Sequence, residues 1–175
     1  MNETVSVPQP AGATRTRTEN AESGFLASAS LASNLQKVLV DLAALSIVGK
    51  QAHWNIVGTN FRDLHLNLDE LVGISRLSSD DVAERMRALH ATPDARPAVI
   101  ADDTSLPEFP QGEIFTHDAI DLVTQAIESA VGTMRDVHDS VDQEDPTTAD
   151  ILHGIIEKLE QQAWFISAET RTPAR

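Results

Sequence analysis

The sequence contains no cysteine and only three lysines, Lys37, Lys50 and Lys158, among its 175 residues. Without thiols the chain cannot form disulfides, zinc–thiolate sites, iron–sulfur clusters or a thiol nucleophile. No stretch approaches the roughly 18–20 uncharged apolar residues of a membrane span. Residues 1–24 also lack the basic start and apolar run of a secretory signal, so we expect a cytoplasmic protein with no membrane partner.

Positive charge is scarce as well. The chain has 13 lysines and arginines against 27 aspartates and glutamates, which gives a formal net charge of −14. A protein this acidic attracts cations and repels polyanions. Metal cations are therefore expected partners, whereas nucleic acid is disfavoured. The length is sufficient for one compact domain and too short for two of ordinary size.

The two ends of the chain differ in composition from its middle. Residues 1–26 are rich in Thr, Pro, Gly, Ala and Asn, with very few large apolar side chains, which predicts a disordered tail. Arg15 and Arg17 in this tail are diluted by three glutamates, so the tail lacks the basic excess typical of a DNA-binding arm. Residues 171–175 form a short C-terminal tail, which leaves 27–170 as the folded domain.

Apolar residues at spacings of three and four predict four long helices between the tails. The first begins at 27–30 and ends near 56, and the second runs from about 60 to 89 with Thr59 or Asn60 as its N-cap. The third begins near 116, and the fourth runs from 147 or 148 to about 169. Linkers of about four residues would make each sequential pair an antiparallel hairpin.

A long crossover at residues 92–115 joins the two expected hairpins and contains four prolines, at 93, 97, 107 and 110. Residues 101–109 within it are a candidate for a short extra helix. Neither internal repeats nor strand-like alternation are visible. A four-helix bundle with one long central crossover has ferritin-like connectivity, so the expected fold class is an all-α, ferritin-like bundle.

Candidate metal ligands are concentrated in the first two helices. His65 and Asp69 are four residues apart on one helix face, as are Asp80 and Glu84 further along the same helix, and His53 lies near the end of the helix before it. Imidazoles with carboxylates and no sulfur suit iron, manganese or zinc. Each pair taken alone is weak evidence, because acidic helices often carry such pairs on a solvated face.

The spacing along the second helix places a constraint on any shared site. His65 and Asp80 are 15 residues apart, which corresponds to about 22 Å along the axis and about 60° around it. The two pairs therefore face alike but cannot share one ion within a single chain. A two-fold axis near position 74 or 75 would place His65 and Asp69 of one chain opposite Asp80 and Glu84 of a second chain.

At these positions the sequence closely resembles the Dps family, the ferritin-like proteins named DNA-binding proteins from starved cells. The segments that carry the resemblance are QAHWNIVGTNF at 51–61, DLHLNLDE at 63–70, DDVAER at 80–85 and DILHGIIEKLEQQAWFI at 150–166. All five positions of the family's ferroxidase signature are matched: His53, His65, Asp69, Asp80 and Glu84. The chain lacks the Glu-x-x-His motif from which ordinary ferritins build a site within one chain.

The resemblance implies a hollow homododecamer that takes up Fe(II), oxidises it with hydrogen peroxide or dioxygen, and stores ferric mineral. It implies that the five ligands bind iron between two-fold-related subunits and that the reaction protects DNA and other targets from oxidative damage. Trp54 would lie beside the iron as an electron donor or, equally, pack in the interface. Acidic residues at the start of the fourth helix would line iron-entry pores, with Glu144, Asp145 and Asp150 as candidates; the alternative is a hydrophilic turn.

Three functions follow as hypotheses. The first is a ferroxidase and iron-storage cage, which the intact ligand set favours. The second is a DNA-binding, nucleoid-compacting protein located at the nucleoid, which the acidic composition disfavours. The third is another enzyme built on the same bundle, for which no nucleophile–base arrangement is visible in the sequence.

Overall fold

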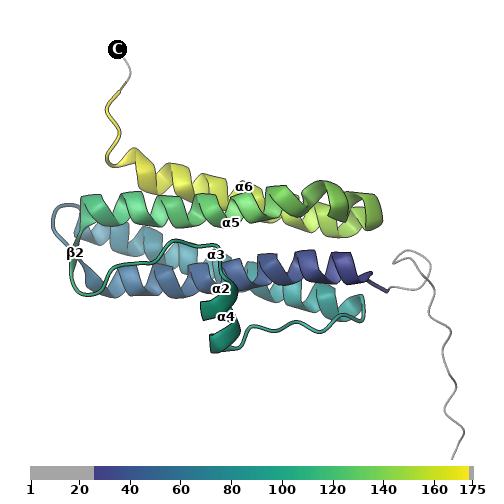
Figure 1. Ribbon diagram of the computed structural model, residues 1–175. Coiled ribbons are helices and arrows are strands. Elements are labelled where there is room, and N and C mark those ends of the chain that lie inside the picture. The colour runs from purple at the N-terminus through teal and green to yellow at the C-terminus, as the bar shows by residue number, and fades with distance from the viewer. Residues whose placement is uncertain (1–25, 174–175) are drawn as a thin grey trace, which may run out of the picture.

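Four long helices pack as an antiparallel bundle in the computed structural model, which describes residues 26–173 (Figure 1). They are α2 (Ala29–Asn55), α3 (Phe61–Ala88), α5 (Thr116–Glu144) and α6 (Pro146–Ala168). The α2–α3 and α5–α6 hairpins lie against each other, and a crossover carrying the short helix α4 (Pro97–Asp103) joins them. The all-α bundle with a long central crossover predicted from the sequence is therefore confirmed.

The apolar stripes of all four helices meet in one core. α2 begins at Ser28, whose Oγ accepts the N–H of Leu31 at 3.0 Å, and its leucines then face the bundle interior. Full burial of a leucine stabilises the fold by about 1.5–3 kcal/mol relative to exposure. The largest fully buried side chains come from α2, α3, α5 and α6 and from the residue after α3: Leu31, Leu35, Leu42, Leu45, Leu64, Leu68, Leu71, Met86, Leu89, Ile127, Met134 and Leu152.

The connection between α5 and α6 is tighter than predicted. The expected linker of about four residues is wrong, because Asp145 alone separates the helices and α6 begins at Pro146. Proline fits this first helical position since its missing N–H would have no partner there. The carbonyl of Asp145 accepts the N–H groups of Thr148 and Ala149, which closes the turn.

The connection between α2 and α3 spans residues 56–60 and relies on left-handed backbone. Gly58 has φ +119°, and Asn60, at the N-cap position, has φ +57° and makes no side-chain cap hydrogen bond. The predicted N-cap residue is therefore in place without the expected side-chain bond. Strand β1 (Ile56–Val57) pairs in parallel with β2 (Ile114–Phe115). The sequence shows no alternation here because each strand has only two residues.

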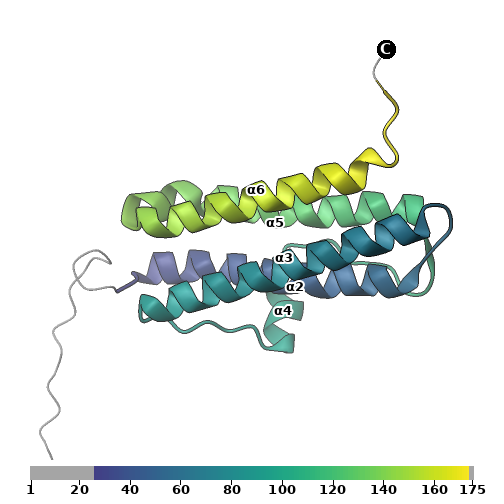
Figure 2. The same cartoon turned by 180° about the vertical axis from the view of Figure 1, so that it is seen from behind.

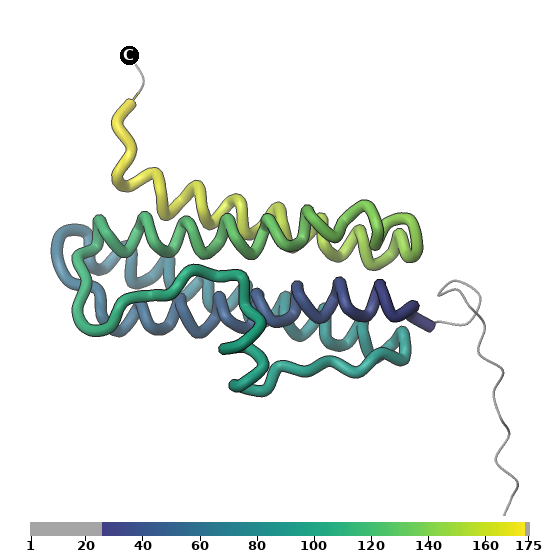
Figure 3. Tube along the Cα trace, in the orientation of Figure 1, coloured from purple at the N-terminus to yellow at the C-terminus, as the bar shows by residue number. Residues whose placement is uncertain are grey.

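The crossover runs along the outside of α2 and turns sharply at α4 (Figure 3). An extra helix is present, but it spans Pro97–Asp103 and not 101–109 as predicted. Pro97 starts it at the first helical position. The Thr104 N–H makes the last helical bond, to the Ile100 carbonyl, and the N–H of Ser105 donates to Asp41 and not to the helix. The predicted tail at 1–26, with Arg15 and Arg17, lies outside the described residues except for Leu26.

Helix α2 is long and apolar enough to cross a membrane by length and composition alone. Half of its most apolar 18-residue window is nevertheless buried inside the bundle, as in a core helix. The helix also contains Lys37, Asp41 and Lys50.

A buried carboxylate ties the crossover to the bundle. Asp41 is 2% exposed and accepts hydrogen bonds from the Thr104 hydroxyl at 3.0 Å, the Ser105 N–H at 2.8 Å and the Ser105 hydroxyl at 2.6 Å. The Thr133 hydroxyl on α5 donates a further bond to it at 2.6 Å. One side chain of α2 thus joins the crossover and α5, because a buried carboxylate requires several donors.

We expect Asp41→Asn to lower the free energy of unfolding by about 2–3 kcal/mol, because the amide group replaces an acceptor oxygen and leaves buried donors unpaired. The measurement is the urea midpoint followed by circular dichroism at one fixed chain concentration, since assembly also shifts apparent stability. Asp102→Asn, which changes an exposed carboxylate of α4, is the matched control. Equal urea midpoints for both variants and the unmodified protein would contradict the stabilising role of Asp41.

Candidate metal centre

Three of the five predicted ligands converge at one end of the α2–α3 hairpin. His53 comes from the last turn of α2, and His65 and Asp69 come from the first half of α3. Ligand atoms of the three side chains all lie within 4.8 Å of one another, the separation required to hold one metal ion. Among residues 26–173, this is the one group of three or more His, Cys, Asp or Glu side chains that meets this criterion.

Close packing of the two helices creates this convergence. A Cβ at Gly49, one turn before His53, would lie 2.8 Å from the Val72 side chain, so only glycine allows α2 to approach α3 this closely. The rings of His53 and His65 are then stacked, with centroids 3.6 Å apart and planes inclined by 27°. The sequence spacing therefore becomes a site through helix packing.

The hydrogen bonding of the two imidazoles fits a metal ligand role. His65 Nδ1 lies 3.2 Å from the backbone carbonyl oxygen of His53, so Nδ1 carries the proton and Nε2 keeps its lone pair. Both ring nitrogens of His53 are buried and have no hydrogen-bond partner within residues 26–173. Nε2 of His53 lies 3.0 Å from Asp69 Oδ2, but outside the direction needed for a hydrogen bond. Unpaired buried nitrogen is unfavourable, and coordination of a cation would remove that cost.

Lys50 neutralises Asp69 in this site. Its ammonium group donates a hydrogen bond to Asp69 Oδ1 from the turn of α2 before His53. This bond lowers the pKa of Asp69, with smaller contributions from the neighbouring His53, while partial desolvation acts in the opposite direction. The carboxylate thus remains ionised at neutral pH, and protonation competes only below its ordinary value of 3.8. Sequence reasoning missed Lys50, although its spacing to His53 is visible.

The other two predicted ligands lie further along α3. Asp80 and Glu84 are exposed and do not join the cluster formed by His53, His65 and Asp69. Asp69, Leu77, Asp80 and Glu84 fall on one exposed stripe, at spacings that keep one helix face. The pair His65 and Asp69 and the pair Asp80 and Glu84 lie apart on one continuous helix, as expected from helix geometry.

Trp54 follows His53 and is 71% exposed. A tryptophan this exposed, next to a candidate ligand, can either pack against another chain or donate an electron, and both roles stay predictions.

Comparison with known proteins places the bundle in a family. Residues 32–174 match the family model of the ferritin-like domain. The chain is 36% identical over 135 residues to DNA protection during starvation protein 2 of Deinococcus radiodurans, covering 77% of the chain and 56% of that protein. It is 30% identical to DNA protection during starvation protein of Agrobacterium fabrum, covering 78% of the chain and 85% of that protein.

A solved structure agrees. The structure of Dps from Microbacterium arborescens in the high iron form has a TM-score of 0.76 and 31% identity, covering 82% of this chain and 97% of that one. The chain belongs to the Dps family of ferritin-like proteins. The resemblance and the ferritin-like fold expected from the sequence are confirmed, and this Dps chain spans just over half of the longer Deinococcus relative.

Two of the three predicted pore residues of this Dps chain are engaged within the subunit. Glu144 accepts the N–H of Ser28 at 2.8 Å and its hydroxyl at 2.6 Å, so it holds the start of α2. Asp145 is 6% exposed and accepts a hydrogen bond from Arg85 at 2.6 Å. Asp150 is exposed, and of the three it alone has no hydrogen bond within the described chain. The pore assignment stays a prediction, and Asp150 is the residue whose exposure suits it.

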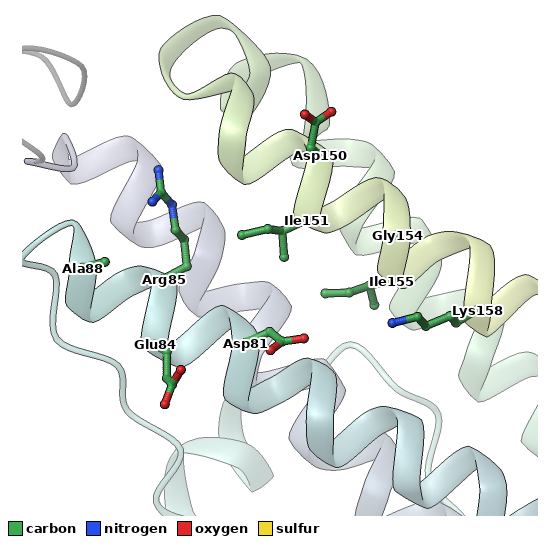
Figure 4. A pocket seen from close by; sticks show the side chains of 9 residues that line it. All are labelled: Asp81, Glu84, Arg85, Ala88, Asp150, Ile151, Gly154, Ile155 and Lys158. Carbon is green, nitrogen blue, oxygen red and sulfur yellow. The ribbon is translucent and has the colours of Figure 1, made fainter.

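A groove of about 540 Å³ lies between α3 and α6, with an apolar floor and charged walls (Figure 4). Glu84 and Asp81 of α3 line one side, and Asp150 and Lys158 of α6 line the other. The two helices lie side by side when the bundle is viewed from behind (Figure 2). A predicted ligand and a predicted pore residue thus border one surface depression, which the sequence spacing does not reveal.

We expect Lys50→Met to increase the affinity of this Dps chain for divalent cations severalfold at neutral pH. The substitution keeps the length of the side chain but removes the cation that occupies Asp69 and repels an incoming ion. The pKa of Asp69 should rise at the same time, since the hydrogen bond from Lys50 is the largest factor that lowers it. Anaerobic Co(II) titration measures the affinity. Lys37→Met, elsewhere on α2, is the control, and an unchanged or weaker affinity in Lys50→Met would contradict competition.

Proposed function

We propose that this Dps protein is a cytoplasmic homododecameric cage that oxidises Fe(II) and stores the ferric product, and thereby limits oxidative damage. The observation that carries the proposal is the cluster of His53, His65 and Asp69, in which the buried imidazole of His53 has no hydrogen-bond partner in the described part of the chain. Imidazole and carboxylate are suitable ligands for iron. The relative from Microbacterium arborescens was solved in a high iron form, which supports iron as the substrate.

The exposed stripe of α3 supports completion of the site by a second subunit. The pairs His65 with Glu84 and Asp69 with Asp80 are both centred between Ile74 and Ser75. An antiparallel copy of α3 on a two-fold axis there would bring both pairs into register. Gly73, beside this axis, has open space where a Cβ would be, and Leu77 is 70% exposed. Both features favour close approach of a second chain.

In this arrangement each site receives three ligands from one chain and two carboxylates from its partner. Two Fe(II) ions give one electron each to hydrogen peroxide, and with two protons the oxygen–oxygen bond breaks to form two waters. The carboxylates neutralise the charge gained by the iron, since hard oxygen ligands favour the ferric state. Dioxygen is the alternative oxidant. As an electron donor, Trp54 would supply one of the two electrons that peroxide requires when only one Fe(II) ion is bound at the site.

The acidic composition supports cation uptake by the assembled cage. Twelve chains at −14 each give a formal charge of −168. Such a field concentrates Fe(II) at the surface. Asp150, with Glu144 and Asp145 as weaker candidates, would add local negative charge where iron enters. Sedimentation velocity tests the assembly, and a monomer that oxidises iron at the full rate would contradict the shared site.

The central prediction concerns the two carboxylates. We expect Asp80→Ala/Glu84→Ala to slow Fe(II) oxidation about 100-fold or more. The reason is that both carboxylates would stabilise the positive charge that develops on iron in the reaction. The fold of each chain should remain intact because both side chains are exposed on the single bundle, and sedimentation velocity checks that the variant still assembles. Stopped-flow absorbance of ferric product measures the initial rate. Asp81→Ala, also exposed on α3, is the matched control, and an unchanged rate in the double variant would reject the assignment.

Mixed cages provide a sharper test of sharing between chains. A His53→Ala/His65→Ala chain and an Asp80→Ala/Glu84→Ala chain should each be inactive alone. After co-assembly, one of the two sites in a mixed dimer contains all five native ligands, so part of the activity should return. Absence of rescue in cages verified as mixed by mass spectrometry would count against a shared site.

DNA binding is the alternative function, and the relatives from Deinococcus and Agrobacterium are named for DNA protection during starvation. We expect DNA binding to be weak or absent near 150 mM salt, because non-specific binding requires Lys and Arg to neutralise phosphates. Salt screens the negative charge of the protein beyond about 8 Å but does not make it positive. Gel-shift titration with linear duplex in the presence of chelator tests this. Retardation at submicromolar cage that is lost when residues 1–24 are deleted would show a DNA arm containing Arg15 and Arg17.

A further inference from the structure

A second pair of histidines meets across the other hairpin of the bundle. His138 on α5 and His153 on α6 lie about two helical turns on either side of Asp145, where the chain reverses. Their ring centroids are 4.5 Å apart and the ring planes are inclined by 30°. The pair is formed by α5 and α6 alone and shares no residue with the cluster on α2 and α3.

The hydrogen bonding of His138 repeats the pattern seen at His65. Its Nδ1 lies 3.2 Å from Asp139 Oδ1, which keeps the proton on Nδ1 and leaves the lone pair on Nε2. That Nε2 is buried and has no hydrogen-bond partner among the described residues. An oriented ring with an unpaired, buried acceptor nitrogen is the arrangement of a histidine prepared to bind a metal ion.

Helix α6 contributes His153 and Asp150 on the other side of the pair. His153 is 60% exposed, so its ring is free to rotate toward His138, and its Nδ1 is 3.9 Å from Asp150 Oδ1, one turn earlier on α6. Two imidazoles on one zinc ion, at about 2.0–2.1 Å each, have ring centroids roughly 5 Å apart. The observed centroid separation of 4.5 Å is close to this value, and a rotation of the exposed His153 ring would turn its nitrogen toward the same ion.

We propose that His138 and His153, with Asp150 as third ligand, form a second metal site for a divalent transition ion that prefers imidazole, such as Zn(II) or Co(II). Two nitrogens and one carboxylate oxygen are a common zinc donor set, with water completing four-coordination. The exposed carboxylates of Asp142 and Glu157, one turn beyond each histidine, make the surroundings negative. All three ligands come from one chain, and Asp150 is shared with the proposed pore.

Isothermal titration of the full-length, chelator-treated protein with Zn(II) tests the proposal. His138→Gln and His153→Gln should each bind one ion per chain fewer than the unmodified protein, and the double variant should lose no more than either single variant. His117→Gln is the matched control, because His117 also lies beside an aspartate, with its Nε2 3.3 Å from Asp118, but on the far end of α5. It should bind as many ions as the unmodified protein.

Asp139→Asn provides a measurement that does not remove a ligand. Asp139 is fully exposed, so its loss should not affect folding, but His138 loses its orienting carboxylate and the affinity of this site should fall about tenfold. Unchanged stoichiometry in both His138→Gln and His153→Gln would overturn the proposal, as would an equal loss in His117→Gln. Circular dichroism and sedimentation confirm that each variant is folded and assembled; because His153 is exposed, His153→Gln keeps the test decisive even if His138→Gln unfolds.

Discussion

The packing of α2 against α3 is the constraint on which the candidate metal centre depends. Gly49 lets the helices approach until a Cβ at that position would be 2.8 Å from Val72. This approach brings His53 over His65, and the carbonyl of His53 then sets the proton position on the His65 ring. The same contact places Lys50 on Asp69. A shift of about 1 Å between the helices would alter all of these contacts. It would also disrupt the candidate metal centre, because metal ligands need to be held within about 0.5 Å.

Acidic side chains serve two separate purposes in this bundle. Asp41, Glu144 and Asp145 are held by hydrogen bonds between segments distant in the sequence, and they fasten the crossover, the start of α2 and the start of α6. Asp80, Glu84 and Asp150 remain exposed on α3 and α6. Negative charge alone therefore does not identify a cation site: Asp80, Glu84 and Asp150 are exposed and available, whereas a cation at Asp69 must compete with Lys50.

The two histidine pairs occupy equivalent positions in the two hairpins. In each pair, one ring holds its Nδ1 proton against an oxygen, and a buried ring nitrogen lacks a hydrogen-bond partner among the residues that the structure describes. The pair on α2 and α3 has Asp69 close enough to form a three-ligand cluster, whereas the pair on α5 and α6 needs a rotation of His153 to engage Asp150. Antiparallel hairpins bring together side chains that are equally far from the turn, which explains why both hairpins can build such a pair.

The sequence by itself determined the helices, because 3.6-residue periodicity records which side chains are buried. It predicted five candidate ligands from their spacing, of which the fold brings three together. It also determined that His65 and Asp80 cannot meet in one chain, since helix rise fixes their separation. Only tertiary structure decided that Asp145 forms the whole α5–α6 turn, that α4 begins at Pro97, and that Lys50 occupies Asp69. Only tertiary structure brought His138 to His153. These contacts join residues without a common period, so their partners depend on how the helices pack and not on spacing along any one helix.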